Sequence, residues 1–295
     1  MSDERPHFST RALLREHRRL LDQRPTGLKK TLGQHLLAHE GMLREIARQC
    51  KITAQSLVIE IGAGVGNLTQ ALLEYSPAHY VGIELDQRFR LLHERFFKYV
   101  ETSTFIYDDI LQVNLSHLTQ GHPEVIIVGN IPYQITSPLI MKILSENMKW
   151  DRIVFTIQKE VAERLTAPPG TRRISGLSIK VSFFARAHIA FLISASNFIP
   201  PPRVDSAVIV LTPRQERLLP ESDVPAFFRL IEAAYGHRRK TIVNSLYYTY
   251  AREKEKNTIR AALERSGISP EARAETLSLE DFIRLFHNFQ LDNHF

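Results

Sequence analysis

The apolar residues of the chain change their spacing repeatedly between Gly41 and Thr212. Short runs with almost no polar residue predict buried strands, and these runs read SLVIEIG, HYVGIEL, TFIYDDI, EVIIVGNIPY and RIVFTIQ. Segments with apolar residues at helical spacing lie between them, for example residues 41–50, 67–75 and 88–99. Near-continuous apolar strands that alternate with helices are typical of a parallel sheet covered on both faces. The pattern therefore predicts an α/β fold with a doubly wound sheet.

The pattern changes toward the C-terminus. The apolar run LSIKVSFFARAHIAFLIS, residues 177–194, is interpreted as one or two strands at an edge of the sheet. The segment FIPPPRVDSAVIVLTP then predicts a proline-rich turn before a last strand. After Pro213, the segments PAFFRLIEAAY, RKTIVNSLYYTYAR, NTIRAALERSG and SLEDFIRLFHNF predict a small all-helical domain. We expect a basic extension over residues 1–27, the α/β domain over 28–213 and the helical domain over 214–295.

The charge balance favours a polyanionic partner. The chain of 295 residues has 38 Lys and Arg against 32 Asp and Glu, a net charge of +6 and a pI near 9.4. Such a balance favours nucleic acid over an acidic small molecule. The arginines of residues 1–27 accompany a short leucine stripe that predicts one helix. We interpret this extension as solvated in preference to a dedicated RNA-binding arm.

Cysteine usage and hydropathy limit the class of protein. Cys50 is the single cysteine, so no internal disulfide can form, and no Cys or His lies near it at the spacing of zinc ligands. No apolar stretch approaches the roughly 20 residues of a membrane helix, and the charged N-terminus does not fit a secretory signal. The sequence thus predicts a cytoplasmic protein with no metal site and no membrane partner, and we expect it to be monomeric.

A glycine-rich turn follows the first predicted strand of the sheet. Gly62, Gly64 and Gly66 come directly after Glu60 and Ile61 and before a predicted helix. Glycine lets the backbone approach a ligand, and a helix N-terminus favours polar or anionic groups. The turn therefore marks the ligand crevice of a doubly wound sheet. The alternation of the glycines departs from a dinucleotide fingerprint and, with Glu60 before it, resembles the S-adenosylmethionine-binding turn of class I methyltransferases.

Carboxylates end the next two predicted strands. Glu84 stands at the tip of HYVGIEL, where a carboxylate can accept both hydroxyls of a ribose. Asp86 suits a helix N-cap. Asp108 and Asp109 follow the third strand. One of this pair can accept the exocyclic amine of an adenine, or the two can form a capping pair, and their spacing favours neither interpretation.

The fourth predicted strand ends in Gly129-Asn130-Ile131-Pro132-Tyr133. Asparagine followed by an apolar residue, proline and an aromatic residue has the form used by methyltransferases that act on the amino group of adenine. The lone pair of this amine is delocalised into the ring. The Asn130 side-chain carbonyl and the Ile131 backbone carbonyl can accept hydrogen bonds from the amine and favour positive charge on its nitrogen, and Tyr133 can stack on the extruded base. An ordinary Asx turn is the less favoured interpretation.

Further segments, taken with these motifs, resemble the ribosomal RNA adenine dimethyltransferases in the order in which that family carries them. The segments are TLGQHLL (31–37), QKEVAERL (158–165), FIPPPRVDSAV (198–208) and RRKT (238–241). The likeness runs from about residue 28 to the C-terminus, and QKEVAERL with the proline-glycine loop after it resembles the small-subunit branch. The resemblance implies a Rossmann-like class I S-adenosylmethionine-dependent methyltransferase domain followed by the helical domain.

The resemblance also implies roles for single residues. The residues expected to line the cofactor are His35, Leu37, Gly62, Gly64, Glu84, Asp109 and Asn130. Tyr133 and Phe198 are expected to sandwich the target adenine, and the expected catalytic set is Asn130, Ile131, Tyr133 and Phe198. Leu36 stands where the family most often has phenylalanine, which removes an aromatic contact near the mouth of the site. The residues expected to bind RNA phosphates are Arg238, Arg239 and Lys240.

The function implied by the resemblance is transfer of methyl groups from S-adenosylmethionine to the N6 amino groups of two adjacent adenosines. These adenosines lie near the 3′ end of 16S ribosomal RNA in the small ribosomal subunit or its precursor, and the step belongs late in ribosome biogenesis. One alternative is the related 23S ribosomal RNA methyltransferase of the macrolide-resistance type. Another is a non-catalytic ribosome-assembly or transcription factor on the same fold, which the presence of Glu84, Asp109 and Asn130 disfavours.

Overall fold

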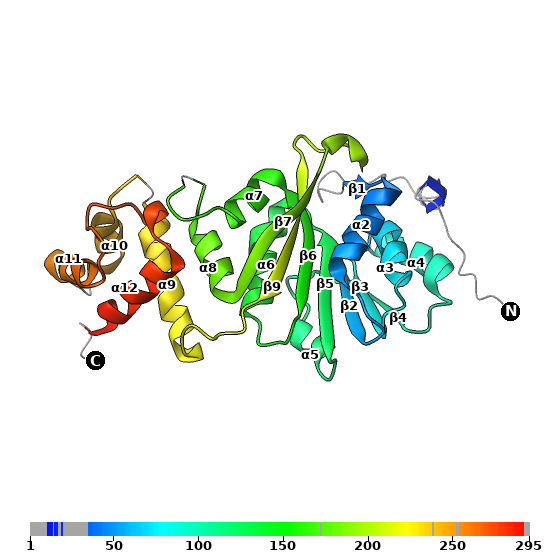
Figure 1. Cartoon of the computed structure of the whole chain (residues 1–295). Coiled ribbons are helices and arrows are strands. Elements are labelled where there is room, and N and C mark those ends of the chain that lie inside the picture. The colour runs from blue at the N-terminus through cyan, green and yellow to red at the C-terminus, as the bar shows by residue number, and fades with distance from the viewer. Residues whose placement is uncertain are drawn as a thin grey trace. The chain divides into compact units, whose positions relative to one another are not determined.

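The computed structural model describes residues 11–13, 15–16, 19, 35–171, 173–237, 239–251 and 254–291. The chain divides into two compact units (Figure 1). The first unit contains the N-terminal part of the chain through Ala162 together with His188–Pro213. The second unit contains Glu163–Ala187 and the chain from Arg214 onward. Each unit is therefore built from two separate stretches of sequence.

A seven-stranded sheet with the order β4-β3-β2-β5-β6-β9-β7 forms the centre of the first unit. Its strands are β2 (Ser56–Ile61), β3 (His79–Ile83), β4 (Ser103–Ile106), β5 (Glu124–Asn130), β6 (Arg152–Gln158), β7 (Ala185–Ile193) and β9 (Ser206–Pro213). The strands β4, β3, β2, β5 and β6 run parallel, and β9 pairs antiparallel with β6. The predicted α/β fold with a mostly parallel sheet is confirmed.

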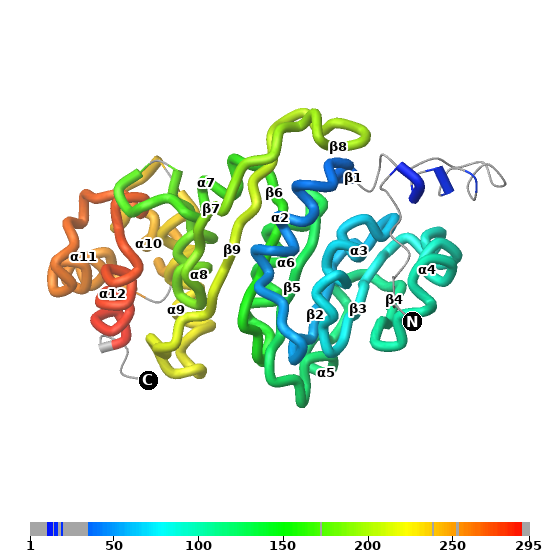
Figure 2. Tube along the Cα trace, turned by 45° about the vertical axis from the view of Figure 1, so that its right-hand side comes forward, coloured from blue at the N-terminus to red at the C-terminus, as the bar shows by residue number. Residues whose placement is uncertain are grey.

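Helices cover both faces of this sheet. The helices α2 (Glu40–Cys50), α3 (Asn67–Leu73) and α4 (Arg90–Phe97) share one apolar cluster with the strands. The helix α6 (Thr136–Ser145) connects the parallel strands β5 and β6 and lies on the opposite face (Figure 2), as a right-handed crossover requires. A short helix, α5 (Leu115–Thr119), precedes β5. Because the faces are covered, the ends of the strands are the part of the sheet open to a ligand.

The strand order reverses between β2 and β5. Along the chain, β2 is followed by β3 on one side of the sheet, whereas β5 is followed by β6 on the other side. The two strands approach closely because Gly129 has no side chain, and a Cβ atom there would collide with the Ile61 carbonyl oxygen. In a doubly wound sheet, the ligand crevice lies at the carboxyl ends of the strands at such a point.

A second, two-stranded sheet joins segments that are far apart in the sequence (Figure 2). Its strands are β1 (Leu36–Leu37) and β8 (Phe198–Ile199), which pair antiparallel. The N–H of Ala38 adds a hydrogen bond to the Asn197 carbonyl at 2.8 Å. This pairing fixes the segment before α2 within the first unit.

The second unit is helical. Its helices are α8 (Gly176–Phe184), α9 (Val224–Gly236), α10 (Ile242–Tyr250), α11 (Lys256–Arg265) and α12 (Leu279–Leu291), and α7 (Lys159–Leu165) leads into it. Phe227, Leu246, Leu263 and Phe282 are fully buried in one apolar cluster. The helices predicted after Pro213 are confirmed, because each contributes apolar residues at helical spacing to this cluster. No helix among the described residues is long and apolar enough to cross a membrane.

The interpretation of residues 177–194 as strands is wrong for the first part of this segment. That part forms α8, and the second part forms β7. A capping box starts α8, in which Ser175 and Ser178 exchange hydrogen bonds between side chain and backbone. Ile179 and Phe183, one helical turn apart, pack into the apolar cluster of the second unit. The cap and this packing select a helix for a run whose composition also suits a strand.

The boundary between the units also differs from the prediction. The chain does pass into the second unit after Pro213, but Glu163–Ala187, expected in the α/β domain, already belong to it. The reason is that α8 packs its apolar residues against α9 and α12. Spacing along the sequence cannot reveal this, because the partners of α8 come later in the chain.

Candidate functional site

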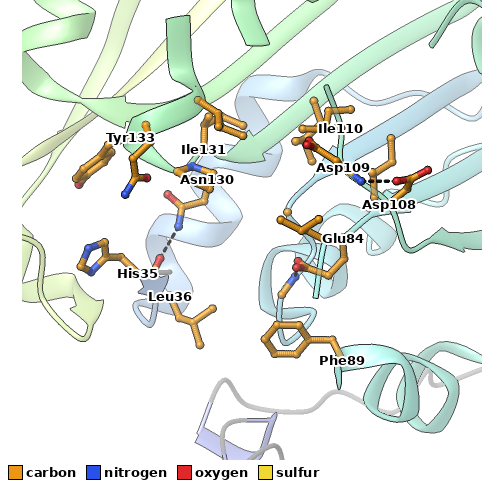
Figure 3. Close-up of a pocket in the computed structure, with 18 residues that line it drawn as sticks. His35, Leu36, Glu84, Phe89, Asp108, Asp109, Ile110, Asn130, Ile131 and Tyr133 are labelled. Atoms are coloured by element: carbon orange, nitrogen blue, oxygen red, sulfur yellow. Dashed lines mark hydrogen bonds between the residues drawn. The ribbon is translucent and has the colours of Figure 1, made fainter. Parts of the chain in front are cut away.

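A cavity of about 260 Å³ lies at the carboxyl ends of the parallel strands in the first unit (Figure 3). The predicted site residues that line it are His35, Gly62, Gly64, Glu84, Asp109, Asn130, Ile131 and Tyr133. Leu36, Phe89 and Ile110 add apolar surface. The strand ends that the sequence singles out therefore meet at one place.

The glycine-rich turn forms one wall of the cavity. Gly62, Gly64 and Gly66 have φ angles of 78°, 54° and 84°, in the left-handed region that side chains disfavour. A Cβ atom at Gly66 would also collide with the Phe97 ring. The N–H of Gly62 donates to the Ile83 carbonyl at 2.8 Å, which ties the turn to the end of β3. The turn therefore lets a ligand approach its backbone closely.

Glu84 holds this turn from the cavity side. Its Oε2 accepts a hydrogen bond from the Gly64 N–H at 2.8 Å, and its Oε1 accepts one from the Asp86 N–H at 2.9 Å. Burial raises the pKa of Glu84, and the two backbone donors oppose this rise. Each carboxylate oxygen has a second lone pair. Both oxygens can therefore still accept hydrogen bonds from the hydroxyl groups of a ligand.

The other carboxylates at the strand ends have two different roles: Asp86 caps a helical turn, and Asp109 lines the cavity. Asp86 caps the short helical turn before α4, where it accepts from the Arg88 N–H at 3.1 Å, so its predicted capping role is confirmed. Asp109 lines the cavity, and its Oδ1 also accepts from the Leu111 N–H at 2.9 Å. Asp108 accepts from the Asp109 N–H (Figure 3). In the described parts of the chain, no group of three or more His, Cys, Asp and Glu side chains is arranged to hold a metal ion.

Asn130 ends β5 and lines the cavity (Figure 3). Its Nδ2 donates a hydrogen bond to the backbone carbonyl of His35 at 2.6 Å. A carbonyl can only accept, so this bond decides the orientation of the amide: the nitrogen faces His35 and the oxygen faces away from it. The N–H of Ile131 donates to the Thr156 carbonyl at 3.0 Å, which fixes the residue that follows. The geometry leaves the Asn130 oxygen as an acceptor for a ligand.

Tyr133 and His35 form an aromatic pair beside Asn130 (Figure 3). Their ring centroids lie 5.9 Å apart, with an angle of 27° between the planes. The Nδ1 of His35 lies 2.7 Å from the Pro200 carbonyl oxygen and so donates to it. The Tyr133 hydroxyl lies 3.0 Å from the Oγ of the buried Ser206. Ser206 lies in the motif segment 198–208, but the sequence indicates no role for it, because only the fold brings it next to Tyr133.

Two predicted site residues do not line the cavity. Leu37 and Phe198 are each 2% exposed and pack in the apolar cluster that α2 and α3 share with the sheet. They face each other in the pairing of β1 with β8. Successive side chains of a strand point to opposite sides, so Leu36 faces the cavity in place of Leu37. The ring beside Tyr133 is that of His35, and Phe198 belongs to the core.

The N-terminal extension supports one wall of the cavity. Its described residues are helical, and Leu13 is 1% exposed, packed against Leu36 and Phe89. Those two residues also line the cavity. Glu16 forms an ion pair of 2.6 Å with Arg95 of α4. The interpretation of the extension as solvated is therefore wrong at Leu13, and the leucine stripe was the signal for this packing.

The basic cluster expected to bind RNA lies between α9 and α10. Arg239 and Lys240 are exposed there, whereas Arg238 lies outside the described residues, as does the motif segment 31–34. Tyr248 is exposed, and its ring centroid lies 4.6 Å from that of the exposed His237. Exposed cations can bind the phosphates of a nucleic acid, and exposed aromatic rings can stack on its bases.

Known proteins are similar to nearly the whole chain. The family model described as ribosomal RNA adenine dimethylase matches residues 26–291. A curated protein named ribosomal RNA small subunit methyltransferase A, from Staphylococcus aureus (strain Newman), is 37% identical over 276 residues. The alignment covers 91% of this chain and 92% of that protein.

Solved structures share the architecture. A dimethyladenosine transferase from Plasmodium falciparum has a TM-score of 0.73 at 28% identity, and the match covers 87% of this chain and 98% of that one. The 23S rRNA methyltransferase ErmE has a TM-score of 0.66 at 24% identity, over 86% of this chain and 99% of that one. At this identity, the likeness to ErmE shows the fold alone.

Proposed function

Because the chain belongs to the ribosomal RNA adenine dimethylase family, we propose that it transfers methyl groups from S-adenosylmethionine to 16S ribosomal RNA. The proposed targets are the N6 amino groups of two adjacent adenosines near the 3′ end of this RNA. The step takes place late in biogenesis of the small subunit. The curated relatives at 37% identity are named for the small subunit, which favours this RNA over 23S ribosomal RNA. The Plasmodium relative is named a dimethyladenosine transferase, which supports two methyl groups on one adenosine. A non-catalytic role is not favoured, since these relatives are named as enzymes.

The residues around the cavity fit S-adenosylmethionine. The glycine-rich turn admits a ligand against its backbone, and Glu84 offers two carboxylate oxygens to the ribose hydroxyls. Asp109 offers a carboxylate to the exocyclic amine of the cofactor, and Leu36 and Phe89 offer apolar surface. When bound there, the cofactor supplies a methyl group on a positively charged sulfur, which makes the methyl carbon electrophilic.

The target amine is a weak nucleophile because its lone pair is delocalised into the adenine ring. The Asn130 oxygen, oriented by the His35 carbonyl, can accept one hydrogen bond from this amine, and the Ile131 carbonyl can accept the other. Two acceptors stabilise the positive charge that develops on the nitrogen and hold its lone pair in line with the methyl group. The orientation of the Asn130 amide is the observation that carries the proposal.

The target base must leave its stack to reach Asn130. Tyr133, whose hydroxyl is held by Ser206, offers a ring on which the base can stack, and His35 extends the aromatic surface. In the second unit, we propose that the exposed Arg239 and Lys240 bind phosphates of the same RNA. The monomeric state and the cytoplasmic location stay predictions from the sequence.

Radiolabelled S-adenosylmethionine and 30S particles that lack the modification test the proposal. The label should map to two adjacent adenosines near the 3′ end of 16S ribosomal RNA, as dimethyladenosine by mass spectrometry, and 50S particles should stay unlabelled. Asn130→Ala should abolish the labelling, whereas Asn147→Ala, a matched change at an exposed asparagine outside the cavity, should not. Label in 23S ribosomal RNA would overturn the choice of substrate, and no label in any RNA would overturn the proposed activity.

A further inference from the structure

His93 of α4 is buried behind the glycine-rich turn, and none of the motifs described above includes it. It is 1% exposed. Its Nε2 lies 2.8 Å from the Gly64 carbonyl oxygen, and its Nδ1 lies 2.8 Å from the Tyr107 hydroxyl. Its ring stacks on Phe105, with centroids 4.2 Å apart and an angle of 20°. Both ring nitrogens are therefore paired although the residue lies in the core.

The two partners of His93 determine which nitrogen carries the proton. A backbone carbonyl only accepts, so Nε2 must carry a hydrogen and donate it to Gly64. The neutral ring then has a lone pair on Nδ1, which accepts the hydroxyl hydrogen of Tyr107. Burial lowers the pKa of His93 to about 4, which agrees with a neutral ring at physiological pH. Arg90 lies 4.5 Å from the centroid of the Tyr107 ring and packs over it.

Gly64 is consequently held at both of its backbone groups. Glu84 accepts from its N–H on the cavity side, and His93 donates to its carbonyl. Glycine has more backbone freedom than any other residue, and these two bonds restrict it at the turn. We infer that His93 is a positioning residue for the cofactor, because its bond to the Gly64 carbonyl, together with the bond from the Gly64 N–H to Glu84, holds the backbone angles of Gly64 and so the position of the Glu84 carboxylate. This inference rests on the proposed function.

Substitution of His93 by glutamine or by asparagine tests its two hydrogen bonds one at a time. Glutamine reaches about as far as Nε2 and can donate to Gly64, whereas asparagine reaches only about as far as Nδ1. We expect His93→Gln to bind S-adenosylhomocysteine within about threefold of wild type, and His93→Asn to bind it about tenfold more weakly because the buried Gly64 carbonyl is left unpaired. Isothermal titration calorimetry measures both affinities. His117→Asn, at an exposed histidine, is the matched control.

The kinetic constants distinguish positioning from a general loss of stability. In His93→Asn, the KM for S-adenosylmethionine should rise while the affinity for the 30S particle stays unchanged, and His93→Gln should restore the KM. If His93→Asn does not fold, His93→Met keeps the volume, loses both bonds and should show the same loss of affinity. Equal affinities in folded variants would overturn the inference and leave the proposed function intact. A wild-type protein that does not bind S-adenosylhomocysteine would instead overturn the proposed function.

Discussion

Tyr80 donates a hydrogen bond to the carboxyl group of Glu60 across 2.5 Å, and both residues are buried on the neighbouring strands β3 and β2. Thr69 of α3 donates to the same carboxyl oxygen at 2.7 Å. Desolvation raises the pKa of Glu60 to about 8, and the two donors oppose it only in part. Glu60, which precedes the glycine-rich turn, is therefore mostly protonated near neutral pH and belongs to the core.

This pKa predicts how stability depends on pH. Between pH 4.5 and about pH 8, the folded protein keeps a proton on Glu60 that the unfolded chain releases. The free energy of unfolding should therefore fall as the pH rises through this window, by up to about 1.4 kcal/mol per pH unit. Glu60→Gln keeps an acceptor for Tyr80 and Thr69 and cannot ionise, so it should lack this contribution. Urea unfolding of both proteins across the window measures the difference.

His93 contributes to the same measurement in the opposite sense. Its pKa in the folded protein is lowered to about 4, so the unfolded chain takes up a proton first as the pH falls below about 6.5. Comparison of wild type with Glu60→Gln at each pH cancels this contribution. Glu101→Gln, at an exposed carboxyl, is the matched control. Parallel stability curves for wild type and Glu60→Gln would mean that Glu60 is ionised in the folded protein.

Asn130→Ala should reduce the rate of methyl transfer far more than it reduces binding of the 30S particle. In the proposed role, the Asn130 oxygen acts mainly as positive charge develops on the amine, and loss of one aligned contact of this kind raises the barrier by about 3 kcal/mol. Asn130→Asp keeps an acceptor and should retain part of the activity. Single-turnover methylation gives the rates, and filter binding gives the affinity. A near wild-type rate for Asn130→Ala would exclude the role proposed for the amide oxygen.

Glu84→Ala should weaken binding of S-adenosylhomocysteine by about 1–3 kcal/mol. The change removes the acceptors proposed for the ribose hydroxyls and also the partner of the Gly64 N–H. Glu84→Gln keeps one acceptor oxygen and should give an intermediate affinity. Calorimetry measures all three proteins, with Glu101→Ala as the exposed control. If Glu84→Ala bound as tightly as wild type, Glu84 would not belong to the binding site.

Leu13→Asp should weaken binding of S-adenosylhomocysteine although Leu13 does not itself line the cavity. An aspartate cannot stay packed against Leu36 and Phe89 without a large desolvation cost, so the cavity wall should lose its support. We expect a loss of about threefold to tenfold in affinity by calorimetry. Arg11→Ser, at an exposed position of the same helical segment, is the control. Equal affinities for the two variants would mean that the extension packs without influencing the site.

Replacement of Arg239 and Lys240 by glutamine should weaken binding of the 30S particle and flatten its salt dependence. Each phosphate contact releases counterions, so the slope of log K against log salt should decrease by about 1–2. The affinity for S-adenosylhomocysteine should stay the same. Lys51→Gln, at an exposed lysine of the first unit, should leave the slope unchanged. If the double variant kept the wild-type slope, the basic cluster would be only a solvated face.

The strands and the polar groups at their ends could be predicted from the sequence because burial on both faces leaves an uninterrupted apolar run. The run RIVFTIQ is β6 residue for residue. Glu84 and Asn130 follow from the same logic, since a polar residue at the end of such a run lies at the carboxyl edge of the sheet. These features depend only on neighbours along the chain.

Features that depend on distant partners could not be predicted. The side-chain directions of Leu37 and Phe198 follow from the pairing of two short strands that the sequence alone does not bring together. The apolar residues of α8 are spread around the helix, so no period distinguishes this segment from a strand. His93 carries no motif, and only its burial beside Gly64 reveals its role.

The interleaving of the two units in the sequence constrains how the chain can fold during synthesis. The helix α8 leaves the ribosome before α9, yet the partners of Ile179 and Phe183, such as Phe227, lie in helices made afterwards. The strand β9, which pairs with β6, also follows α8. A chain that completes its sheet as soon as β9 is made does so before the partners of the α8 side chains exist, and apolar side chains exposed at such a stage favour aggregation. The helical unit can therefore complete its core only after the last strand of the sheet has been made.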